Sequence, residues 1–337
     1  MTSHPHRNSM EAVSERLVLG VDIGGTKIAA AVVAEGGKIT ARGYSPTEAQ
    51  AGPGAVIDNI AATIAQAISS AHLTPRQLSG IGIAAAGIID SESGRVIFSP
   101  NLPGWREVPL RDIVRERFNI PACLGNDATL AALGEWCFGV KKRVSDLIYI
   151  TVSTGIGGGI ICDGRLYTGV RGVAGEVGHM TIDVNGPRCN CGNVGCWETL
   201  ASGTALAREA VREITGGAAT AITGLVGGDL SRVEAKVVFE AAKQGDRLAG
   251  ELISRLGYYL GVGLANLVNI FNPELILVGG GVAKMGDLLL EPAKKVVRER
   301  AFATSAGAVQ IKPALLGDDS SILGAAAFVL DSLAGGK

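Results

Sequence analysis

A histidine and three cysteines in the middle of the chain have the residue types and spacing of a metal site. His179 is followed by Cys189, Cys191 and Cys196 in the run Cys-Asn-Cys-Gly-Asn-Val-Gly-Cys. One imidazole and three thiolates form a closed tetrahedral set for Zn²⁺, which is typical of structural rather than hydrolytic zinc sites. A disulfide pair or three unrelated buried thiols would use the same cysteines, but the loop spacing and an intracellular setting favour zinc.

The intracellular setting is inferred from the N-terminus and from hydropathy. The first residues, Met-Thr-Ser-His-Pro-His-Arg-Asn-Ser, are polar and lack the apolar core of a signal peptide. No apolar segment runs uncharged and free of turn residues for the length of a membrane span. We therefore expect a cytoplasmic protein in which residues 1–16 form a disordered leader, with Met1 and Met10 as alternative starts.

Two glycine-rich turns can supply backbone amides for phosphate oxygens, because successive N–H groups in such turns form a concave donor set. The first turn offers Gly24, Gly25, Thr26 and Lys27, and the second, expected over residues 153–159, offers Thr154, Gly155, Gly157 and Gly158. Neither is a P-loop, because the spacing to Lys27 is wrong and no helix follows directly. Each turn taken alone is equally explained as a structural hairpin.

Two further features would complete a nucleotide site. Asp22 precedes the first turn and can hold Mg²⁺ through water, since this ion binds few carboxylates and keeps several waters. Gly280 and Gly281 follow a buried strand and would allow close approach of a nucleoside.

These residues must be positioned by alternating strands and helices. Continuous apolar runs predict buried strands, and apolar residues at helical spacing predict helices that pack on a sheet. In the first part of the chain we expect strands at 17–22, 28–33, 80–84 and 120–124, a turn-rich loop at 99–105, and helices at 53–71 and 110–118. In the second part we expect strands at 146–152, 160–162 and 275–278 and helices at 201–214, 252–268 and 321–333. Each part opens with a strand, a glycine turn and a strand, which indicates a duplicated α/β architecture.

Composition bounds the domain count and the partners. A single core rarely serves 337 residues, so we expect two domains. We assign 17–125 to an N-terminal α/β domain, 126–320 to a C-terminal α/β domain with a zinc loop at 179–198, and 321–337 to a helix that packs back on the first domain. The balance of 31 basic and 32 acidic side chains gives no global field for nucleic acid. Aromatic content of 4% argues against a base-stacking surface.

Single polar residues in these segments have simple structural explanations. Asn126 and Asp127 precede a helical stretch, where a helix N-cap explains either residue. Asn101, in a loop with two prolines and a glycine, is a common turn former. Glu176 stands three residues before His179, so a structural salt link accounts for it. At this point the structural and the functional interpretations both stand.

Four motifs taken together resemble the ROK family (repressors, open reading frames and sugar kinases), and within it the bacterial ATP-dependent glucokinases. They are Asp22-Ile-Gly-Gly-Thr-Lys27, Thr154-Gly-Ile-Gly-Gly-Gly159, Gly175-Glu-Val-Gly-His179 and Cys189-Asn-Cys-Gly-Asn-Val-Gly-Cys-Trp-Glu198. The likeness runs from about Leu17 to Leu333. The cysteine loop with its trailing glutamate is highly specific, whereas the first glycine turn is shared with the wider actin-like ATPase superfamily.

The resemblance implies a fold, a reaction and site residues. It implies a two-domain, ribonuclease-H-like α/β fold in which ATP and a hexose meet in a cleft, with Mg²⁺ and a structural Zn²⁺. Asp127 would be the general base that takes the proton of the sugar 6-hydroxyl. Glucose is the expected sugar. His179 would serve both zinc and sugar, and the expected sugar ligands are Asn101, Asn126, Glu176, His179 and Glu198.

The resemblance also leaves alternatives. Many relatives have Pro-Gly where this chain has Ala86-Gly87, a difference that bears on sugar positioning. The sugar could instead be N-acetylmannosamine, N-acetylglucosamine or fructose, and the donor could be polyphosphate. A sugar-responsive repressor is disfavoured, because about 16 residues before Leu17 are too few for a three-helix DNA-binding module. We expect a homo-oligomer, either a dimer or a tetramer, with no nucleic-acid or membrane partner.

Overall fold

The computed structural model describes residues 15–335. The predicted leader lies almost entirely outside these residues, as does the question of Met10 as a start. At the first described positions, the carbonyl of Arg16 already accepts a hydrogen bond of 2.9 Å from the amide of Glu35. The chain is therefore attached to the first sheet from Arg16 onward.

The first sheet has five strands in the order β3-β2-β1-β4-β8. The first three strands form an antiparallel meander, while β4 and β8 run parallel to β1. The strands are β1 (Leu17–Ile23), β2 (Lys27–Ala34), β3 (Ile39–Pro46), β4 (Ile81–Ala85) and β8 (Ala122–Asn126). Strand β1 is buried on both faces, because Leu19 packs in one core and Val18 in another. Burial on both faces explains its continuous apolar sequence.

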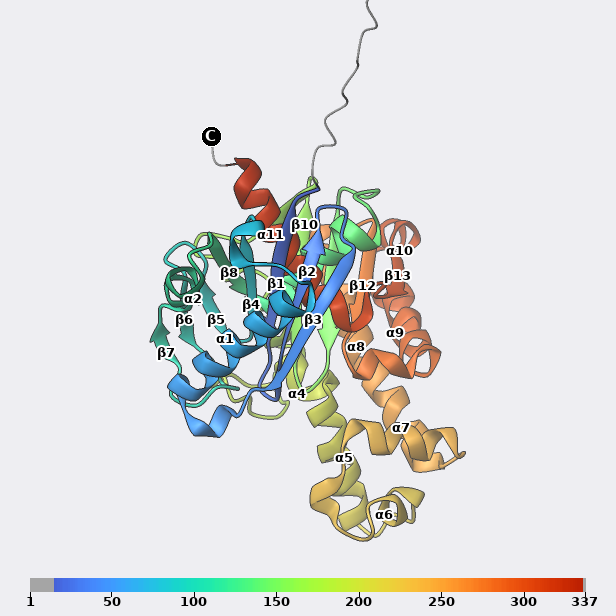
Figure 1. Ribbon diagram of the computed structural model, residues 1–337. Helices are drawn as coiled ribbons and strands as arrows, with labels where there is room; N and C mark the ends of the chain where they lie inside the picture. Colours follow the sequence, from blue (N-terminus) through green and yellow to red (C-terminus); the bar gives the residue numbers. More distant parts are fainter. Residues whose placement is uncertain (1–14, 336–337) are drawn as a thin grey trace, which may run out of the picture.

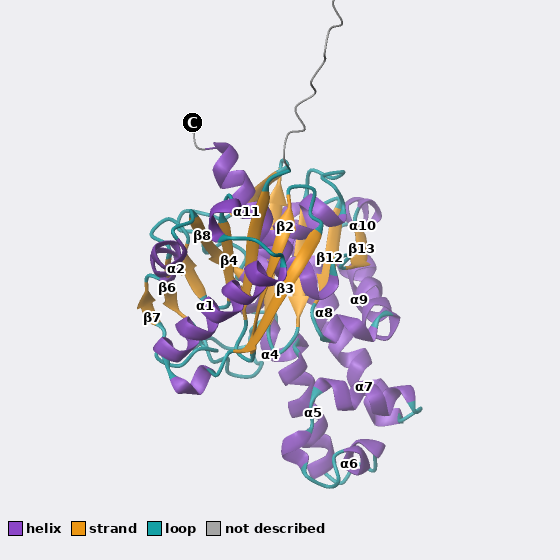
Figure 2. Cartoon of the chain, in the orientation of Figure 1, coloured by secondary structure: helices purple, strands orange, loops and turns teal. Residues whose placement is uncertain are grey.

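The second sheet repeats the arrangement of the first, with the order β11-β10-β9-β12-β13. Here too an antiparallel meander is followed by two strands parallel to the central one. The strands are β9 (Leu147–Val152), β10 (Ile156–Cys162), β11 (Arg165–Tyr167), β12 (Leu275–Gly279) and β13 (Gln310–Pro313). The duplicated architecture predicted from the two hairpins is thus confirmed, as is the mixed α/β fold class (Figure 2).

Two helices fill the space between the sheets. Helix α3 (Asp127–Gly134) packs on β9 and β10, and α11 (Ser320–Gly335) packs on α3 and on β1 and β4, beside which it is drawn in Figure 1. Glycines permit these close contacts. A Cβ atom on Gly20 of β1 would overlap the carbonyl of Ile322, and one on Gly324 would overlap the carbonyl of Leu130. Much of the high glycine content therefore serves helix–sheet and helix–helix packing rather than ligand loops.

The predicted second turn is shorter than expected. We expected a turn over 153–159, but β10 begins at Ile156, so Gly157 and Gly158 are strand residues. A Cβ atom on Gly157 would lie 2.8 Å from the Cβ of Ala128 in α3. The run of glycines is required because α3 lies directly on the strand, and composition alone cannot distinguish that cause from a turn.

Helices cover the outer faces of both sheets. Helix α1 (Pro53–Ser70) begins with proline at its first position and packs on β2 and β3 through the apolar side chains of Ile60 and Ile64. On the second sheet, α8 (Arg247–Phe271) packs on α9 (Asp287–Arg300) and shares a core with β9 and β12. The remaining helices are α2 (Leu110–Phe118), α4 (Trp197–Ala201), α5 (Gly203–Thr215), α6 (Ala221–Leu225), α7 (Ala235–Lys243) and α10 (Ala303–Ala308).

Two smaller features complete the fold. Strands β5 (Ile88–Asp90), β6 (Arg95–Phe98) and β7 (Arg106–Val108) form a separate antiparallel sheet. Helices α5, α6 and α7 extend away from the sheets at the lower right of Figure 1.

Over residues 15–335, none of the helices combines the length and the apolar character that crossing a membrane requires.

Candidate active site and metal centre

The turn between β1 and β2 is braced by Thr47. The hydroxyl of Thr47 donates to the carbonyl of Gly24 at 2.7 Å, and its amide donates to the carbonyl of Thr26 at 2.9 Å. The amide of Gly24 donates to the carbonyl of Lys27 at 3.0 Å. Gly24 is therefore not a free phosphate donor, contrary to the prediction. The amides of Gly25 and Thr26 make no such bond within the described part of the chain.

Asn101 lies against this turn. A Cβ atom on Gly25 would be 3.1 Å from the Cβ of Asn101, so the two backbones approach closely. Asn101 is exposed, between the buried side chains of Leu102 and Trp105 on one side and Ser99 on the other. The predicted sugar ligand and the predicted phosphate turn are thus neighbours.

Asp22, at the end of β1, is an unusual carboxyl group. Its pKa is raised to about 7, mainly by burial and also by the negative charge of Asp127, while Lys27 opposes the shift. Two carboxyl groups that repel each other in a dehydrated setting favour a bound cation. This environment suits the predicted magnesium site at Asp22.

Helix α3 begins with the two polar residues singled out in the sequence. Asn126 is the N-cap, because its Oδ1 accepts a hydrogen bond of 3.0 Å from the amide of Thr129. Its Nδ2 donates to the carbonyl of Gly87 at 3.1 Å. Asp127 is the first helical residue, and its Oδ1 accepts a bond of 2.9 Å from the amide of Ala128. Asn126 is therefore a helix N-cap, as the structural interpretation predicted. The hydrogen bond from Ala128 uses only one carboxylate oxygen of Asp127, so it does not explain the role of the other.

The electrostatic setting of Asp127 is that of a proton acceptor. Burial raises its pKa, and the backbone hydrogen bonds at the helix start act against that shift. Its charge in turn raises the pKa of Asp22 and of Glu176. A carboxylate with a raised pKa and an available oxygen can act as a general base near neutral pH.

Glu176 precedes a single turn of 3₁₀-helix (Val177–His179), and His179 is its last residue. Their closest side-chain atoms, Oε2 and Nε2, are 4.0 Å apart, which is too long for a hydrogen bond. Burial raises the pKa of Glu176, His179 opposes this, and the charges of Asp127 and Glu198 add to it. The charges of Asp127 and Glu198 thus act on the carboxyl group of Glu176.

The second turn is held from two sides. The hydroxyl of Thr204 donates to the carbonyl of Thr154 at 2.7 Å, and the amide of Gly203 donates to the carbonyl of Ser153 at 2.8 Å. On the other side, Oε2 of Glu198 accepts a hydrogen bond of 2.9 Å from the amide of Ile156. The sequence did not reveal the roles of Thr47, Thr204 or Ile156, because nothing in its local pattern links them to the turns.

The glycines after β12 have a structural cause. Gly280 has a φ of 89°, and a Cβ atom there would overlap the carbonyl of Val152 in β9. The close approach that requires this glycine is thus to the neighbouring strand. Gly281 lies beside the second turn, where a Cβ atom would be 3.8 Å from the hydroxyl of Ser153.

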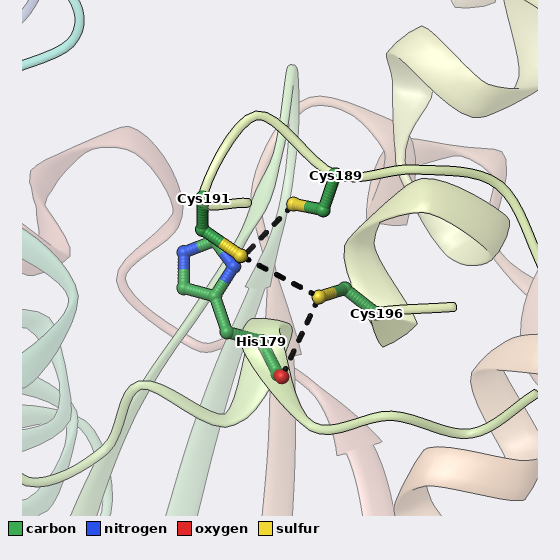
Figure 3. Close-up of side chains that lie close together, drawn as sticks. All are labelled: His179, Cys189, Cys191 and Cys196. Carbon is green, nitrogen blue, oxygen red and sulfur yellow. Dashed lines mark hydrogen bonds between the residues drawn. The ribbon is translucent and has the colours of Figure 1, made fainter. Parts of the chain in front are cut away.

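The histidine and the three cysteines form one cluster. Their ligand atoms all lie within 4.8 Å of one another, and no disulfide joins the cysteines (Figure 3). The Sγ atoms of Cys191 and Cys196 are 3.7 Å apart, as are Sγ of Cys189 and Nδ1 of His179. With a Zn–S distance of about 2.3 Å, tetrahedral geometry places two sulfurs about 3.8 Å apart.

The chemistry of the donor set also fits a metal. Burial raises the pKa of Cys189 and Cys196, so a cation is needed to hold both as thiolates near neutral pH. Nδ1 of His179 faces Cys189, while Nε2 faces Glu176. One ring nitrogen of His179 thus lies in the cluster and the other lies on the side of Glu176.

Comparison with known proteins gives concordant matches. The model of the ROK family matches residues 18–332. A glucokinase of Halalkalibacterium halodurans is 39% identical over 313 residues, which span 93% of this chain and 94% of that protein. A xylose repressor of Caldicellulosiruptor bescii is 39% identical over 270 residues, spanning 80% of this chain and 67% of the repressor. A crystal structure of a ROK family glucokinase from Streptomyces griseus, in complex with glucose and AMPPNP, superimposes with a TM-score of 0.82 at 39% identity, over 93% of this chain and 98% of that one.

Proposed function

This chain belongs to the ROK family, and on that premise we propose that it is an ATP-dependent kinase that phosphorylates the 6-hydroxyl of a hexose, with glucose preferred. The observation that carries the proposal is Asp127 at the start of α3, a carboxylate whose pKa is raised by burial and whose charge acts on Asp22 and Glu176. The preference for glucose is supported by the near full-length identity to glucokinases.

Asp127 is the proposed catalytic residue. Phosphoryl transfer to an alcohol passes through a loose transition state, so the protein contributes mainly positioning and charge stabilisation. One oxygen of Asp127 is held by the amide of Ala128, which fixes the direction of the other oxygen. That second oxygen would accept the proton of the 6-hydroxyl as this hydroxyl attacks the γ-phosphate.

Five residues besides the base are the proposed sugar ligands. Glu176 and Glu198 present carboxylate oxygens, His179 presents Nε2, and Asn101 and Asn126 present amide groups. One N–H of the Asn126 side chain donates to the carbonyl of Gly87, and its oxygen accepts from the amide of Thr129. The second N–H is the group available to a sugar hydroxyl. Because Asn126 fixes the Gly87 carbonyl, the Ala86-Gly87 turn is restrained despite lacking proline.

The two turns are the proposed nucleotide site. Amides of Gly25, Thr26 and Lys27 would bind phosphate oxygens from one side, and Thr154 and Gly155 from the other. Gly281 beside Ser153 leaves room for the nucleoside end. Asp22 would hold Mg²⁺ through water, and the ion would supply charge neutralisation on the phosphates. Gly24, Gly157, Gly158 and Gly280 are left out of this set because their structural roles are accounted for above.

The cysteine cluster is the proposed structural zinc site. Cys189, Cys191, Cys196 and Nδ1 of His179 would hold the ion. With Nδ1 bound, the proton of neutral His179 resides on Nε2, which then donates toward the sugar. The metal would thereby orient a sugar ligand.

The division of the chain remains part of the proposal. We assign one nucleotide- and sugar-binding lobe to 17–125 and the other to 126–320, with the terminal helix bridging them, and a homo-oligomer as the working form. A sugar-responsive repressor is the second candidate, because of the 39% identity to the xylose repressor.

The test is a coupled ADP-release assay across glucose, fructose, mannose, N-acetylglucosamine and N-acetylmannosamine, with ATP and with polyphosphate as donors. The proposal predicts the highest kcat/KM for ATP with glucose. Turnover with an N-acetylhexosamine alone would reassign the sugar. No turnover with any pair, together with sugar-dependent binding to operator DNA, would favour the repressor.

A further inference from the structure

Glu198 lies between the two halves of the proposed site. It belongs to α4, two residues after Cys196 of the metal cluster. Its Oε2 accepts a hydrogen bond of 2.9 Å from the amide of Ile156, the first residue of β10. The residues just before Ile156 form the second glycine turn, so this carboxylate contacts the backbone that continues from the proposed phosphate donors.

The turn rests directly on this carboxylate. A Cβ atom on Gly155 would overlap Oε2 of Glu198, which means that only glycine allows the present contact. The opposite side of the turn is held by Gly203 and Thr204 of α5. The turn is thus fixed on one side by the α5 N-terminus and on the other side by a single acidic side chain.

The second carboxylate oxygen of Glu198, Oε1, takes no part in this hydrogen bond. Oε1 has no hydrogen-bond partner within residues 15–335, and the charge of the carboxylate acts on Glu176. A sugar hydroxyl that donates to Oε1 would therefore restrain the same side chain that holds Ile156. Glu198 is thus a proposed sugar ligand that directly contacts the second glycine turn.

We propose that Glu198 is a positioning residue shared by the sugar site and the phosphate turn, so that binding of sugar and of nucleotide is energetically coupled through one carboxylate. This inference rests on the proposed kinase function. Sugar bound at Oε1 fixes Glu198, which fixes Ile156 and the turn, so that a nucleotide arriving second meets amides already ordered. The coupling is reciprocal: bound nucleotide strengthens sugar binding by the same factor. The second glycine turn is then fully ordered for phosphate binding only when the sugar, whose hydroxyl receives the phosphoryl group, is bound.

The test uses a mutation on the phosphate turn and a measurement on the sugar. In Gly155→Ala the added methyl group displaces the carboxylate of Glu198. Calorimetric titration of glucose with and without a saturating non-hydrolysable ATP analogue measures the coupling: the analogue should tighten glucose binding by about tenfold in the wild type, within the usual range for coupled sites, and by about twofold or less in Gly155→Ala. Thr154→Ala is the matched control on the same turn, because Thr154 is exposed and Thr204 donates to its backbone carbonyl, which the substitution keeps. Thr154→Ala keeps the backbone amide and should leave glucose binding within twofold of the wild type.

A double-mutant cycle separates this route from general damage to the turn. In a Glu198→Ala background, Gly155→Ala should cause no further loss of glucose affinity, because the group it displaces is gone. Circular dichroism and thermal melting verify that each variant is folded. An ATP analogue that tightens glucose binding equally in the wild type and in Gly155→Ala, or equal losses of glucose affinity with and without Glu198, would overturn the coupling. Wild-type protein that binds the ATP analogue but no sugar would instead refute the kinase function on which the coupling rests.

Discussion

Replacement of Asp127 by asparagine separates the role of this residue as a base from its role in the fold. Asparagine has nearly the same shape, and its side-chain oxygen can accept the 2.9 Å hydrogen bond from the amide of Ala128 that Asp127 now accepts. The helix start is therefore preserved, and substitution of a partly exposed residue without loss of a cap changes stability by about 0.5 kcal/mol or less. What is lost is the ability to take a proton.

The size of the effect follows from that loss. Positioned general bases contribute about 10²–10⁴ in rate, which corresponds to about 2.7–5.5 kcal/mol of transition-state stabilisation. We expect kcat of Asp127→Asn to fall by this factor, while the dissociation constant for glucose changes by about threefold or less. Burial has raised the pKa of Asp127, so the asparagine also removes a repulsion toward Asp22 and Glu176 and does not weaken their contacts.

The assay is coupled ADP release for kcat, with calorimetric titration of glucose for binding. Asp112→Asn is a suitable control, because Asp112 is an acidic residue in the first turn of α2, outside the site. The control should keep wild-type kcat. Turnover of Asp127→Asn within about tenfold of the wild type would show that this carboxylate is not the base. A parallel collapse of sugar affinity would show that its role is in binding.

Three further predictions follow from the same structure. Cys191→Ser should lose bound zinc, measured by atomic absorption, and weaken glucose binding by about tenfold because His179 loses its orientation, whereas Cys162→Ser, at an exposed cysteine outside the cluster, should change neither; full glucose affinity without metal would refute the link. The acid limb of the kcat/KM profile should have its midpoint above the usual aspartate pKa of 3.8, because the base must be ionised and burial raises its pKa; a midpoint at or below that value would contradict the assignment. Glu135→Ala should lower the free energy of unfolding in urea by about 3–5 kcal/mol, because the buried Glu135 accepts hydrogen bonds from the amides of Leu315 and Leu316 and from the hydroxyl of Ser320; a loss below about 1 kcal/mol would show that water replaces those bonds.

Periodic patterns predicted most of the regular elements. Helix α2 was expected at its observed bounds, and β1, α1 and β12 within a few residues, because each buries an apolar face whose spacing is visible locally. The duplicated halves were also predictable, since each opens with the same strand, glycine turn and strand. The metal cluster was readable because all of its ligands fall within eighteen residues, 179–196.

Features that depend on distant contacts were not predictable. Gly157 and Gly158 were expected in a turn, but Ala128 and Val177, far away in the sequence, lie where their side chains would be. The bond from Ile156 to Glu198 spans 42 residues and has no local signal. The π-helical turn at Glu135–Gly139 was also missed, although a single acidic residue after the apolar stretch from Ala128 was a hint that a buried carboxylate had backbone partners there.

The roles assigned to the site were inferred from the resemblance as much as from the residues. Asn126 illustrates the point: local reasoning identified an N-cap, and the structure agrees, yet the same side chain keeps one N–H for another partner. A residue can thus satisfy a structural rule and remain available for chemistry. Sequence patterns identify the structural role of such a residue but not the group that it keeps available for a ligand.

The most direct measurement of the central claim is the identity and stoichiometry of the product. Purified protein would be incubated with ATP, Mg²⁺ and glucose, ADP would be quantified by chromatography, and glucose 6-phosphate would be quantified by its dehydrogenase. The account predicts one glucose 6-phosphate for each ADP, and no significant ADP without sugar. ADP without sugar phosphate, or phosphate on another hydroxyl, would contradict it.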